Sequence, residues 1–197
     1  MHFLENSLDH INKRGSIEVI AGSMFSGKTE ELIRRLKRAR IAGLKVEIYK
    51  PALDKRYSDS LVVSHDERSI TSTPVEHASM ILLLSSGVQV VGIDEAQFFD
   101  KAIVDVCNEL ADRGTRVIVA GLDMDYSRQP FGPLPDILAV AEYITKLHAI
   151  CMECGNLANY SYRKGRDKNV VLLGERDVYK PLCRNCFIKL REAEEEI

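Results

Sequence analysis

The sequence predicts an α/β fold, in which a parallel sheet carries helices on both faces. The first signal comes from three short apolar runs, "SIEVIA" (16–21), "VQVVGI" (88–93) and "RVIVAGL" (116–122). Continuous apolar runs of this length are typical of strands that are buried on both faces. Segments with apolar residues at helical spacing lie between these runs, and strands that alternate with helices pair in parallel. The chain is therefore expected to wind helices over both sides of one sheet.

In the N-terminal half, strand 16–21 is followed by a helix that begins at about Lys28 and that Gly43 is placed to end. The apolar stripe of this helix consists of Leu32, Ile33, Leu36 and Ala39. "KVEIYK" (45–50) is expected to form a second strand. Residues 51–74 are polar and show no persistent period, so they are interpreted as a long loop, and long loops in compact domains are often functional.

In the C-terminal half, a helix is expected over 100–113, closed by Gly114, and another over 134–147. The first of these helices carries apolar residues at helical spacing: Ile103, Val104, Cys107, Leu110 and Ala111. The composition changes near Ile150 and marks a second, small unit. A unit of roughly 40 residues buries too little apolar surface to be stable without a metal or disulfide.

Length and charge limit the classes of function. The 197 residues suit one medium domain with a small appendage, and a formal net charge of −2 gives no electrostatic case for nucleic acid. No apolar run approaches the length that spans a bilayer, and residues 1–15 lack the apolar centre of a secretory signal. A cytoplasmic protein is expected, with a polar N-terminal arm (1–14) and an acidic tail (192–197).

The segment "GSMFSGKT" has the spacing of a phosphate-binding loop. It consists of Gly22, Ser23, Met24, Phe25, Ser26, Gly27, Lys28 and Thr29, after a strand and at the start of a helix. Backbone N–H groups of such a loop and the helix N-terminus bind phosphate oxygens. Lys28 is expected to reach the outer phosphates of ATP, and the Thr29 hydroxyl is expected to bind Mg²⁺.

The run "VVGIDEAQFF" (90–99) ends a buried strand with two acids. Asp94, at the strand tip, is expected to hold Mg²⁺ through water. Glu95 would then act on the nucleophile, accepting a proton from a sugar hydroxyl in a kinase or from water in an ATPase. Gln97 is assigned to nucleotide binding. Asp54 and Arg56, after the second strand, either flank the phosphates or belong to a solvated loop.

Four of the five cysteines form two pairs near the C-terminus, Cys151-x-x-Cys154 and Cys183-x-x-Cys186. Two pairs of thiolates can close a tetrahedral shell, so a structural zinc site is predicted rather than a catalytic one. Cys107 stands apart in a helical apolar pattern and is predicted to be a small buried residue.

Seven motifs in order resemble the cellular-type (type II) thymidine kinase family: "GSMFSGKT", "KPALDKRYS", "SHD", "DEAQFF", "GLDMDYSRQPFG", "CMEC" and "CRNC". The resemblance implies that an ATP-binding α/β domain with a phosphate loop (15–149) precedes a zinc-binding lasso domain (150–191). It implies transfer of the γ-phosphate of ATP to the 5′-hydroxyl of thymidine, with Glu95 as general base. Homotetramers and feedback inhibition by dTTP are also implied.

The same resemblance implies a thymidine site. Met24 is expected near the thymine ring, and Phe98, Leu122, Tyr126 and Phe131 are expected to line or support the pocket. In the lasso domain, the thymine edge would be bound by Ser161 and by the backbone of Val170, Val171, Leu172, Leu173 and Gly174. Tyr179 would contact the sugar.

Two other classes of protein remain open at the level of the sequence. One is a phosphate-loop ATPase whose zinc unit grips nucleic acid or a partner, in which Glu95 would activate water. The other is a structural zinc module with an inactive nucleotide site. The near-neutral charge argues against the first, and the presence of Lys28, Thr29, Asp94 and Glu95 argues against the second.

Overall fold

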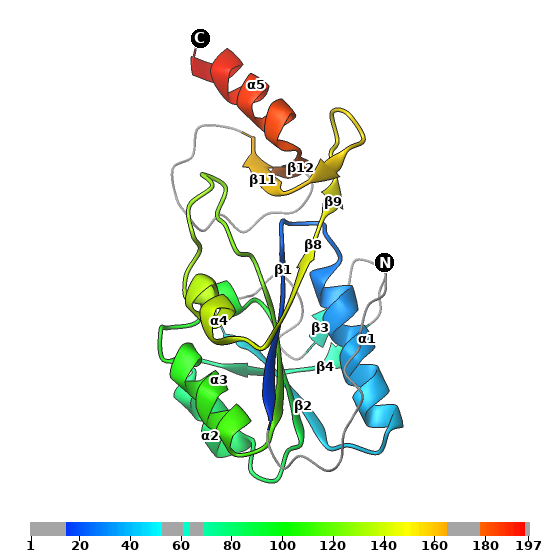
Figure 1. Cartoon of the computed structure of the whole chain (residues 1–197), viewed down its shortest axis with the longest axis vertical. Coiled ribbons are helices and arrows are strands. Elements are labelled where there is room, and N and C mark those ends of the chain that lie inside the picture. The colour runs from blue at the N-terminus through cyan, green and yellow to red at the C-terminus, as the bar shows by residue number, and fades with distance from the viewer. Residues whose placement is uncertain (1–14, 53–60, 64–68, 165–177, 196–197) are drawn as a thin grey trace.

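The structure is a computed structural model that describes residues 15–52, 61–63, 69–164 and 178–195. Its main body is a six-stranded sheet in the order β5-β2-β6-β7-β1-β8, and every pair of neighbouring strands is parallel (Figure 1). The strands of this sheet are β1 (Ser16–Gly22), β2 (Val46–Pro51), β5 (Thr73–Val75), β6 (Val90–Ile93), β7 (Arg116–Gly121) and β8 (Tyr143–Leu147). The predicted α/β class and parallel sheet are confirmed.

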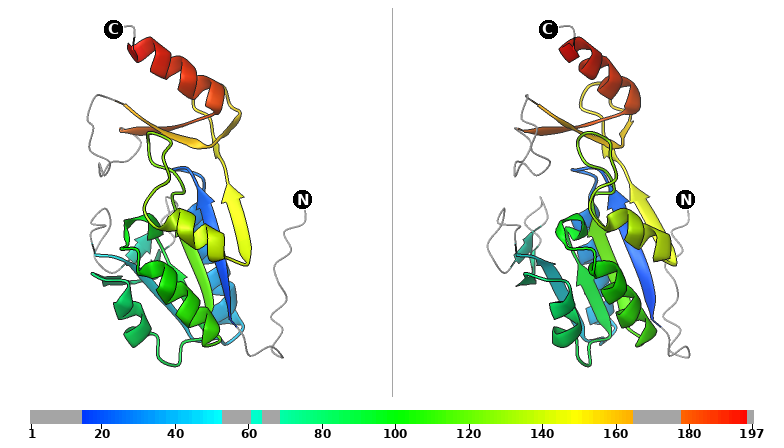
Figure 2. Two further views of the ribbon diagram at one scale, coloured as in Figure 1. Left: turned by 60° about the vertical axis from the view of Figure 1, so that its left-hand side comes forward. Right: turned by 90° about the vertical axis from the view of Figure 1, so that its left-hand side faces the viewer.

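Helices cover both faces of the sheet (Figures 1 and 2). One face carries α1 (Lys28–Ile41), and the other carries α2 (Ser79–Leu84), α3 (Ile103–Asp112) and α4 (Leu134–Val140). Strand β1 shows why both faces are needed: Ile17 and Val19 pack with α3 and α4, whereas Ile20 packs with α1. Because side chains alternate along a strand, each strand in the middle of the sheet contributes to both cores.

Most of the predicted elements lie where expected, within two or three residues. The stripe of α1 is buried as predicted, and Cys107 is fully buried in α3, where burial raises the pKa of its thiol to about 12. The helix expected over 134–147 is wrong in its second half. The helix ends at Val140, the backbone becomes extended at Ala141, and residues 143–147 form β8 beside β1. The run Tyr143-Ile144-Thr145 is rich in strand-forming residues, and pairing with β1 outweighs the helical spacing.

The long loop expected over 51–74 is wrong in part. Strand β2 continues to Pro51, and three short strands follow: β3 (Leu61–Val63), β4 (Ser69–Thr71) and β5. β3 and β4 pair antiparallel, whereas β5 joins the edge of the main sheet beside β2. The short helix α2 was not predicted. Strands of three residues are too short to show a period, so tertiary pairing decides them. The polar arm (1–14) lies outside the described residues.

A C-terminal unit, made of residues 149–163 and 178–195, lies beyond the carboxyl end of the sheet (Figure 1). It contains β9 (Ala149–Ile150), β10 (Leu157–Ala158), β11 (Tyr160–Arg163), β12 (Tyr179–Leu182) and α5 (Arg184–Glu195). These elements form two antiparallel pairs, β9 with β10 and β11 with β12. The unit has its own small core, with Tyr160, Tyr162 and Leu182 around Phe187.

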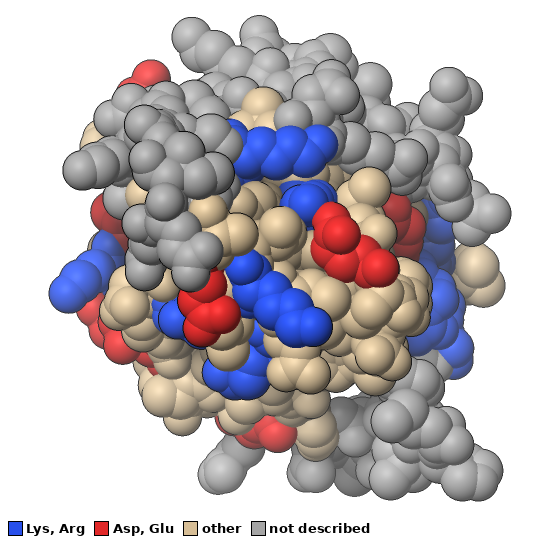
Figure 3. All heavy atoms as spheres, turned by 90° about the horizontal axis from the view of Figure 1, so that it is seen from above, with Lys and Arg blue, Asp and Glu red and all other residues tan. Residues whose placement is uncertain are grey.

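Helix length and surface charge bear on membrane and nucleic-acid binding. None of the helices in the described ranges is both long and apolar enough to cross a bilayer. Seen from the end that carries α5, basic and acidic side chains lie next to one another rather than on separate faces (Figure 3). This mixture fits the net charge of −2 and provides no uniformly basic face at this end.

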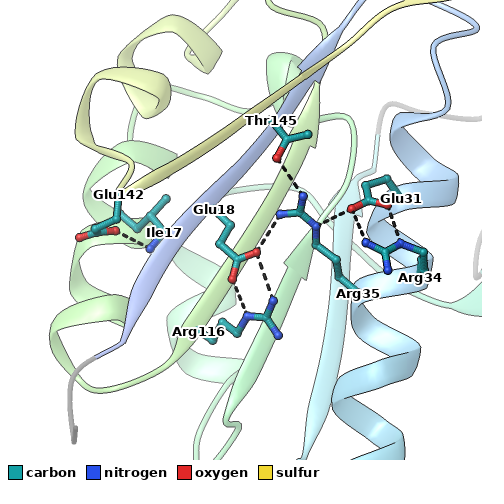
Figure 4. A network of polar contacts seen from close by, with 8 residues as sticks. All are labelled: Ile17, Glu18, Glu31, Arg34, Arg35, Arg116, Glu142 and Thr145. Atoms are coloured by element: carbon teal, nitrogen blue, oxygen red, sulfur yellow. Dashed lines mark hydrogen bonds and ion pairs between the residues drawn. The ribbon is translucent and has the colours of Figure 1, made fainter. Parts of the chain in front are cut away.

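A buried charge network ties α1 to the sheet (Figure 4). Glu18 of β1, only 4% exposed, accepts hydrogen bonds from Arg35 at 2.8 Å and from Arg116 of β7 at 2.5 Å. Arg35 also donates to Thr145 of β8 at 2.9 Å and to Glu31 at 2.8 Å. A buried carboxylate is costly unless it is paired and hydrogen-bonded, and here two guanidinium groups satisfy it. The network therefore joins one helix to three neighbouring strands.

We expect Arg35→Met to destabilise the fold by about 3 kcal/mol, because Glu18 then keeps only the partly exposed Arg116 as a partner. Arg34→Met is the matched control, since Arg34 also binds Glu31 but its side chain is 46% exposed. Its cost should stay below about 1 kcal/mol. Urea unfolding of the two variants measures the difference, and equal costs would show that burial of the network contributes nothing.

Candidate active site

The segment 22–29 forms a loop at the carboxyl end of β1 and leads directly into α1. Gly22 has no room for a side chain, since a Cβ there would lie 2.4 Å from the Leu147 carbonyl oxygen. Phe25 adopts a left-handed backbone conformation with φ of 64°. The Lys28 ammonium donates a hydrogen bond to the Ser23 carbonyl at 2.8 Å, so it folds back over the loop. The loop thus brings the Lys28 ammonium close to the N-terminus of α1, an arrangement that is suited to phosphate binding.

Two acids face this loop from the end of β6. The Thr29 hydroxyl lies 3.3 Å from one Asp94 carboxylate oxygen, and the Glu95 N–H donates to the other at 2.9 Å. Asp94 is buried and Glu95 is partly buried. Thr29 and Asp94 come from separate strand-to-helix connections, 65 residues apart, and their oxygens are a pair that Mg²⁺ accepts. The residues present fit a magnesium ion between loop and strand tip.

The charge balance at the loop depends on Lys28. Burial lowers the pKa of its ammonium, and the carboxylates of Glu95, Asp94 and Asp123 act in the opposite direction. One lysine therefore shares its surroundings with several acids. A phosphate that enters adds further negative charge, which favours binding together with a divalent cation.

Glu95 occupies an unusual backbone position. Its φ of 51° and ψ of 41° are left-handed, a conformation that costs a non-glycine residue about 1 kcal/mol or more. One carboxylate oxygen accepts a hydrogen bond from the Gln97 side-chain amide at 2.5 Å. Sequence analysis assigns Gln97 to nucleotide binding, whereas the structure buries its amide between Glu95 and the Leu122 N–H.

Aromatic residues line the same end of the sheet. Phe98 and Phe131 pack edge to face with ring centroids 5.5 Å apart, and the Leu122 side chain is buried at the end of β7. The Tyr126 ring is covered by the Arg163 guanidinium at 3.5 Å from its centroid. Arg163 belongs to β11, so this contact joins the 123–132 connection to the C-terminal unit. Phe98 and Phe131 are thus in contact near the end of β7, whereas Tyr126 contacts the C-terminal unit.

The C-terminal unit also contacts the phosphate loop. The Met24 N–H donates to the Ser161 hydroxyl at 2.9 Å, and the Ser23 hydroxyl lies 3.4 Å from the Ala158 carbonyl oxygen. Ser161 and Tyr179 are both buried, on the paired strands β11 and β12. The other predicted site residues, Asp54, Arg56 and Val170 to Gly174, lie outside the described residues, as does the "SHD" motif (64–66).

The four predicted metal ligands come together at the end of the C-terminal unit. The sulfur atoms of Cys151, Cys154, Cys183 and Cys186 all lie within 4.8 Å of one another, and those of Cys154 and Cys183 are 3.6 Å apart. Sulfur atoms around a tetrahedral zinc ion are about 3.8 Å apart, given Zn–S bonds of about 2.3 Å. The cluster therefore fits a metal ion of this size.

The thiols influence one another strongly. Burial would raise the pKa of Cys151, but backbone N–H groups from Cys183, Glu153 and Cys154 lower it to about 6. Contacts with Cys154 and Cys183 raise the pKa of Cys186 to about 12. Four sulfurs in one small volume do not all ionise unless a cation compensates their charge.

Sequence reasoning missed one ion pair at this site. Asp123, two residues after β7, is buried and its carboxylate lies 2.5 Å from the Lys146 ammonium near the end of β8. The signal was available, because Asp123 follows a buried strand as Asp94 does. Lys146 gave no such signal, because it fell within the helix expected over 134–147.

The parallel sheet, the loop at its carboxyl edge and the facing acids define a nucleoside triphosphate-binding protein of the phosphate-loop class. Comparison of the sequence with known protein families identifies one family within this class. The sequence pattern of the family described as "Thymidine kinase" matches residues 15–187. The chain belongs to the thymidine kinase family, as the ordered motifs predicted.

Several relatives match this chain over almost its whole length. A thymidine kinase of Porphyromonas gingivalis (strain W83) is 59% identical over 186 residues, which are 94% of this chain and 91% of that protein. A thymidine kinase of Bacteroides thetaiotaomicron is 56% identical over 189 residues, covering 96% and 95%. One from a Rhodothermus species is 59% identical over 180 residues, covering 91% and 84%.

We expect Lys28→Ala to weaken ATP binding at least tenfold while the fold persists, because the ammonium bonds to the loop rather than to the core. Lys37→Ala serves as the control, since Lys37 is an exposed lysine on the same helix. Calorimetric titration with ATP and thermal melting of both variants give the two quantities. An unfolded Lys28→Ala variant, or unchanged ATP affinity, would contradict this role.

Proposed function

We propose that this chain transfers the γ-phosphate of ATP to the 5′-hydroxyl of thymidine, giving dTMP and ADP. The observation that carries the proposal is the position of Glu95. Glu95 directly follows β6, its N–H donates to the Asp94 carboxylate, and its own carboxylate is close enough to Lys28 to raise the pKa of that ammonium. A base next to the site of the outer phosphates can serve an acceptor hydroxyl that approaches from the opposite side.

In the proposed reaction, the Glu95 carboxylate accepts the proton of the 5′-hydroxyl. The oxygen forms a bond to the γ-phosphorus, and the bond from that phosphorus to the bridging β,γ-oxygen breaks. ADP leaves with the electron pair. Lys28 and the loop N–H groups bind the phosphate oxygens and offset the charge that moves to ADP. Thr29 and Asp94 would hold Mg²⁺, which neutralises phosphate charge when it is bound.

The proposed thymidine site consists of residues that follow the carboxyl ends of the strands and of residues from the C-terminal unit. Met24, Phe98, Leu122, Tyr126 and Phe131 would surround the base, supported by the edge-to-face pair of phenylalanines. Ser161 and the backbone of residues 170–174 would bind the thymine edge, and Tyr179 the sugar. On this proposal the unit 150–191 closes over a nucleoside that the domain 15–149 phosphorylates. The contact between Ser161 and Met24 supports such an arrangement.

The remaining proposals concern the metal, regulation and assembly. Zinc in the cysteine cluster would be structural, because four sulfurs fill its shell and leave no position for substrate. Asp54 and Arg56 would flank the phosphates. Inhibition by dTTP, a homotetramer and a cytoplasmic location stay predictions.

We expect Glu95→Gln to lower kcat about 10²–10⁴-fold, the usual contribution of general-base catalysis, while ATP still binds. The substitution keeps an acceptor oxygen for the Gln97 amide, so the turn should keep its shape. Glu109→Gln, at an exposed ion pair of α3, should leave kcat unchanged.

Transfer of radiolabelled phosphate is measured with thymidine, deoxycytidine or no nucleoside. Release of labelled phosphate to water, with no labelled dTMP formed when thymidine is present, would favour an ATPase and overturn the proposed function. Near-normal transfer by Glu95→Gln would remove this residue from the mechanism.

We expect Cys183→Ser to lose zinc and to raise KM for thymidine more than KM for ATP, because the C-terminal unit carries Ser161 and Tyr179. Cys107→Ala is the matched control, a buried cysteine in α3 that should keep one zinc per chain. Metal content is measured by mass spectrometry on the same preparations as the kinetics. An equal rise in both KM values would point to general unfolding instead.

A further inference from the structure

Gln97 occupies a buried position at the centre of the site. It belongs to the short 3₁₀ helix η1 (Ala96–Phe98), directly after the acid pair, and its exposed fraction is 3%. Its side-chain oxygen accepts a hydrogen bond from the Leu122 N–H at 2.9 Å, and its side-chain nitrogen donates to Glu95 at 2.5 Å. One amide thus joins the end of β7 to the carboxylate that follows β6.

The chemistry of the two partners fixes the orientation of this amide. The Leu122 N–H can only donate, so the Gln97 oxygen must face it. The NH₂ group then faces the Glu95 carboxylate, which accepts. Any rotation that exchanges oxygen and nitrogen would set donor against donor at Leu122 and acceptor against acceptor at Glu95, and the Leu122 N–H is buried away from water.

Two glycines allow the neighbouring backbone to approach Gln97 closely. A Cβ on Gly121 would lie 2.7 Å from the Gln97 side-chain oxygen. A Cβ on Gly132 would lie 2.1 Å from the Gln97 carbonyl oxygen, and Gly132 has a φ of +55°. The end of β7 and the connection to α4 therefore both pack closely against this one residue. Because β7 packs closely against the Gln97 side-chain oxygen, this side chain has little freedom to turn toward another partner.

We propose that Gln97 is a positioning residue that holds the Glu95 carboxylate in its working direction and couples it to the backbone of the Leu122 pocket wall. The inference rests on the proposed role of Glu95 as base. It assigns Gln97 a function through Glu95 rather than through the nucleotide. The left-handed backbone of Glu95 agrees with this, since a strained residue keeps its conformation only where its surroundings hold it.

The expected effect is on turnover. Without the Gln97 amide, the Glu95 carboxylate should rotate more and spend less time in line with the acceptor hydroxyl. Misplacement by about 1 Å can lower the rate by a factor of about 10². We expect Gln97→Met, which has a similar length and no hydrogen-bonding amide, to lower kcat about 10–100-fold. KM for ATP should change less than about twofold, because the phosphate loop is not altered.

The test is a double-mutant cycle of Gln97→Met with Glu95→Gln, measured by radiolabelled phosphate transfer from ATP to thymidine. If Gln97 acts through Glu95, its replacement should lower kcat in the wild-type background and hardly further in the Glu95→Gln background. Gln89→Met is the matched control, since the exposed Gln89 likewise accepts a backbone N–H bond, from Lys45. Its kcat should equal that of the wild type.

Each outcome decides the inference. Equal losses of kcat in both backgrounds would overturn it in favour of a purely structural role. A raised KM for ATP with unchanged kcat would overturn it in favour of nucleotide binding. If Glu95→Gln alone is fully active, the proposed base fails, and the inference fails with it. Should Gln97→Met not fold, Gln97→Asn replaces it, because its amide is one methylene too short to span both partners.

Discussion

The arrangement of this site depends on the direction of the strands. Since all six strands of the main sheet run parallel, each ends at the same edge, and residues that follow different strands meet there. β6, β7 and β1 are adjacent, so the acids after β6, Leu122 after β7 and the loop after β1 fall within three strand widths. The buried Glu18 network holds α1 against these strands and thereby fixes the start of the helix that carries Lys28 and Thr29.

The sequence predicted the parts of the fold that depend on local pattern. Buried strands such as 88–93 are continuous apolar runs, and the buried face of α1 is a regular spacing of apolar residues. Both patterns are visible in the sequence. Strand β8 could not be recognised, because Ile137, Val140 and Ile144 continue a helical spacing while the segment pairs with β1. β5 has three residues, and only its register beside Tyr49 to Pro51 makes it a strand.

The candidate site likewise has features that the local sequence predicts and features that depend on the folded backbone. The phosphate loop and the cysteine pairs each consist of residues close in sequence, so the spacing alone was enough to name them as candidates. The amide of Gln97, the Asp123–Lys146 ion pair and the stacking of Arg163 on Tyr126 join residues 2 to 37 positions apart through the folded backbone. Gln97 and Tyr126 could be named from the sequence, and Asp123 follows a buried strand, but the contacts that these residues make do not follow from any local pattern.

The hydrogen bond from the Met24 N–H to Ser161 has a thermodynamic consequence. It joins the phosphate loop to the strand pair that the cysteine cluster anchors, and Phe25 packs against the same small core. A metal ion bound by the four cysteines would order this core, and a nucleotide would order the loop, so both would act on one shared contact. By linkage, any factor by which the metal raised nucleotide affinity would equal the factor by which the nucleotide raised metal affinity. Retention of the metal during chelation would then report on nucleotide bound at the other end of the same contact.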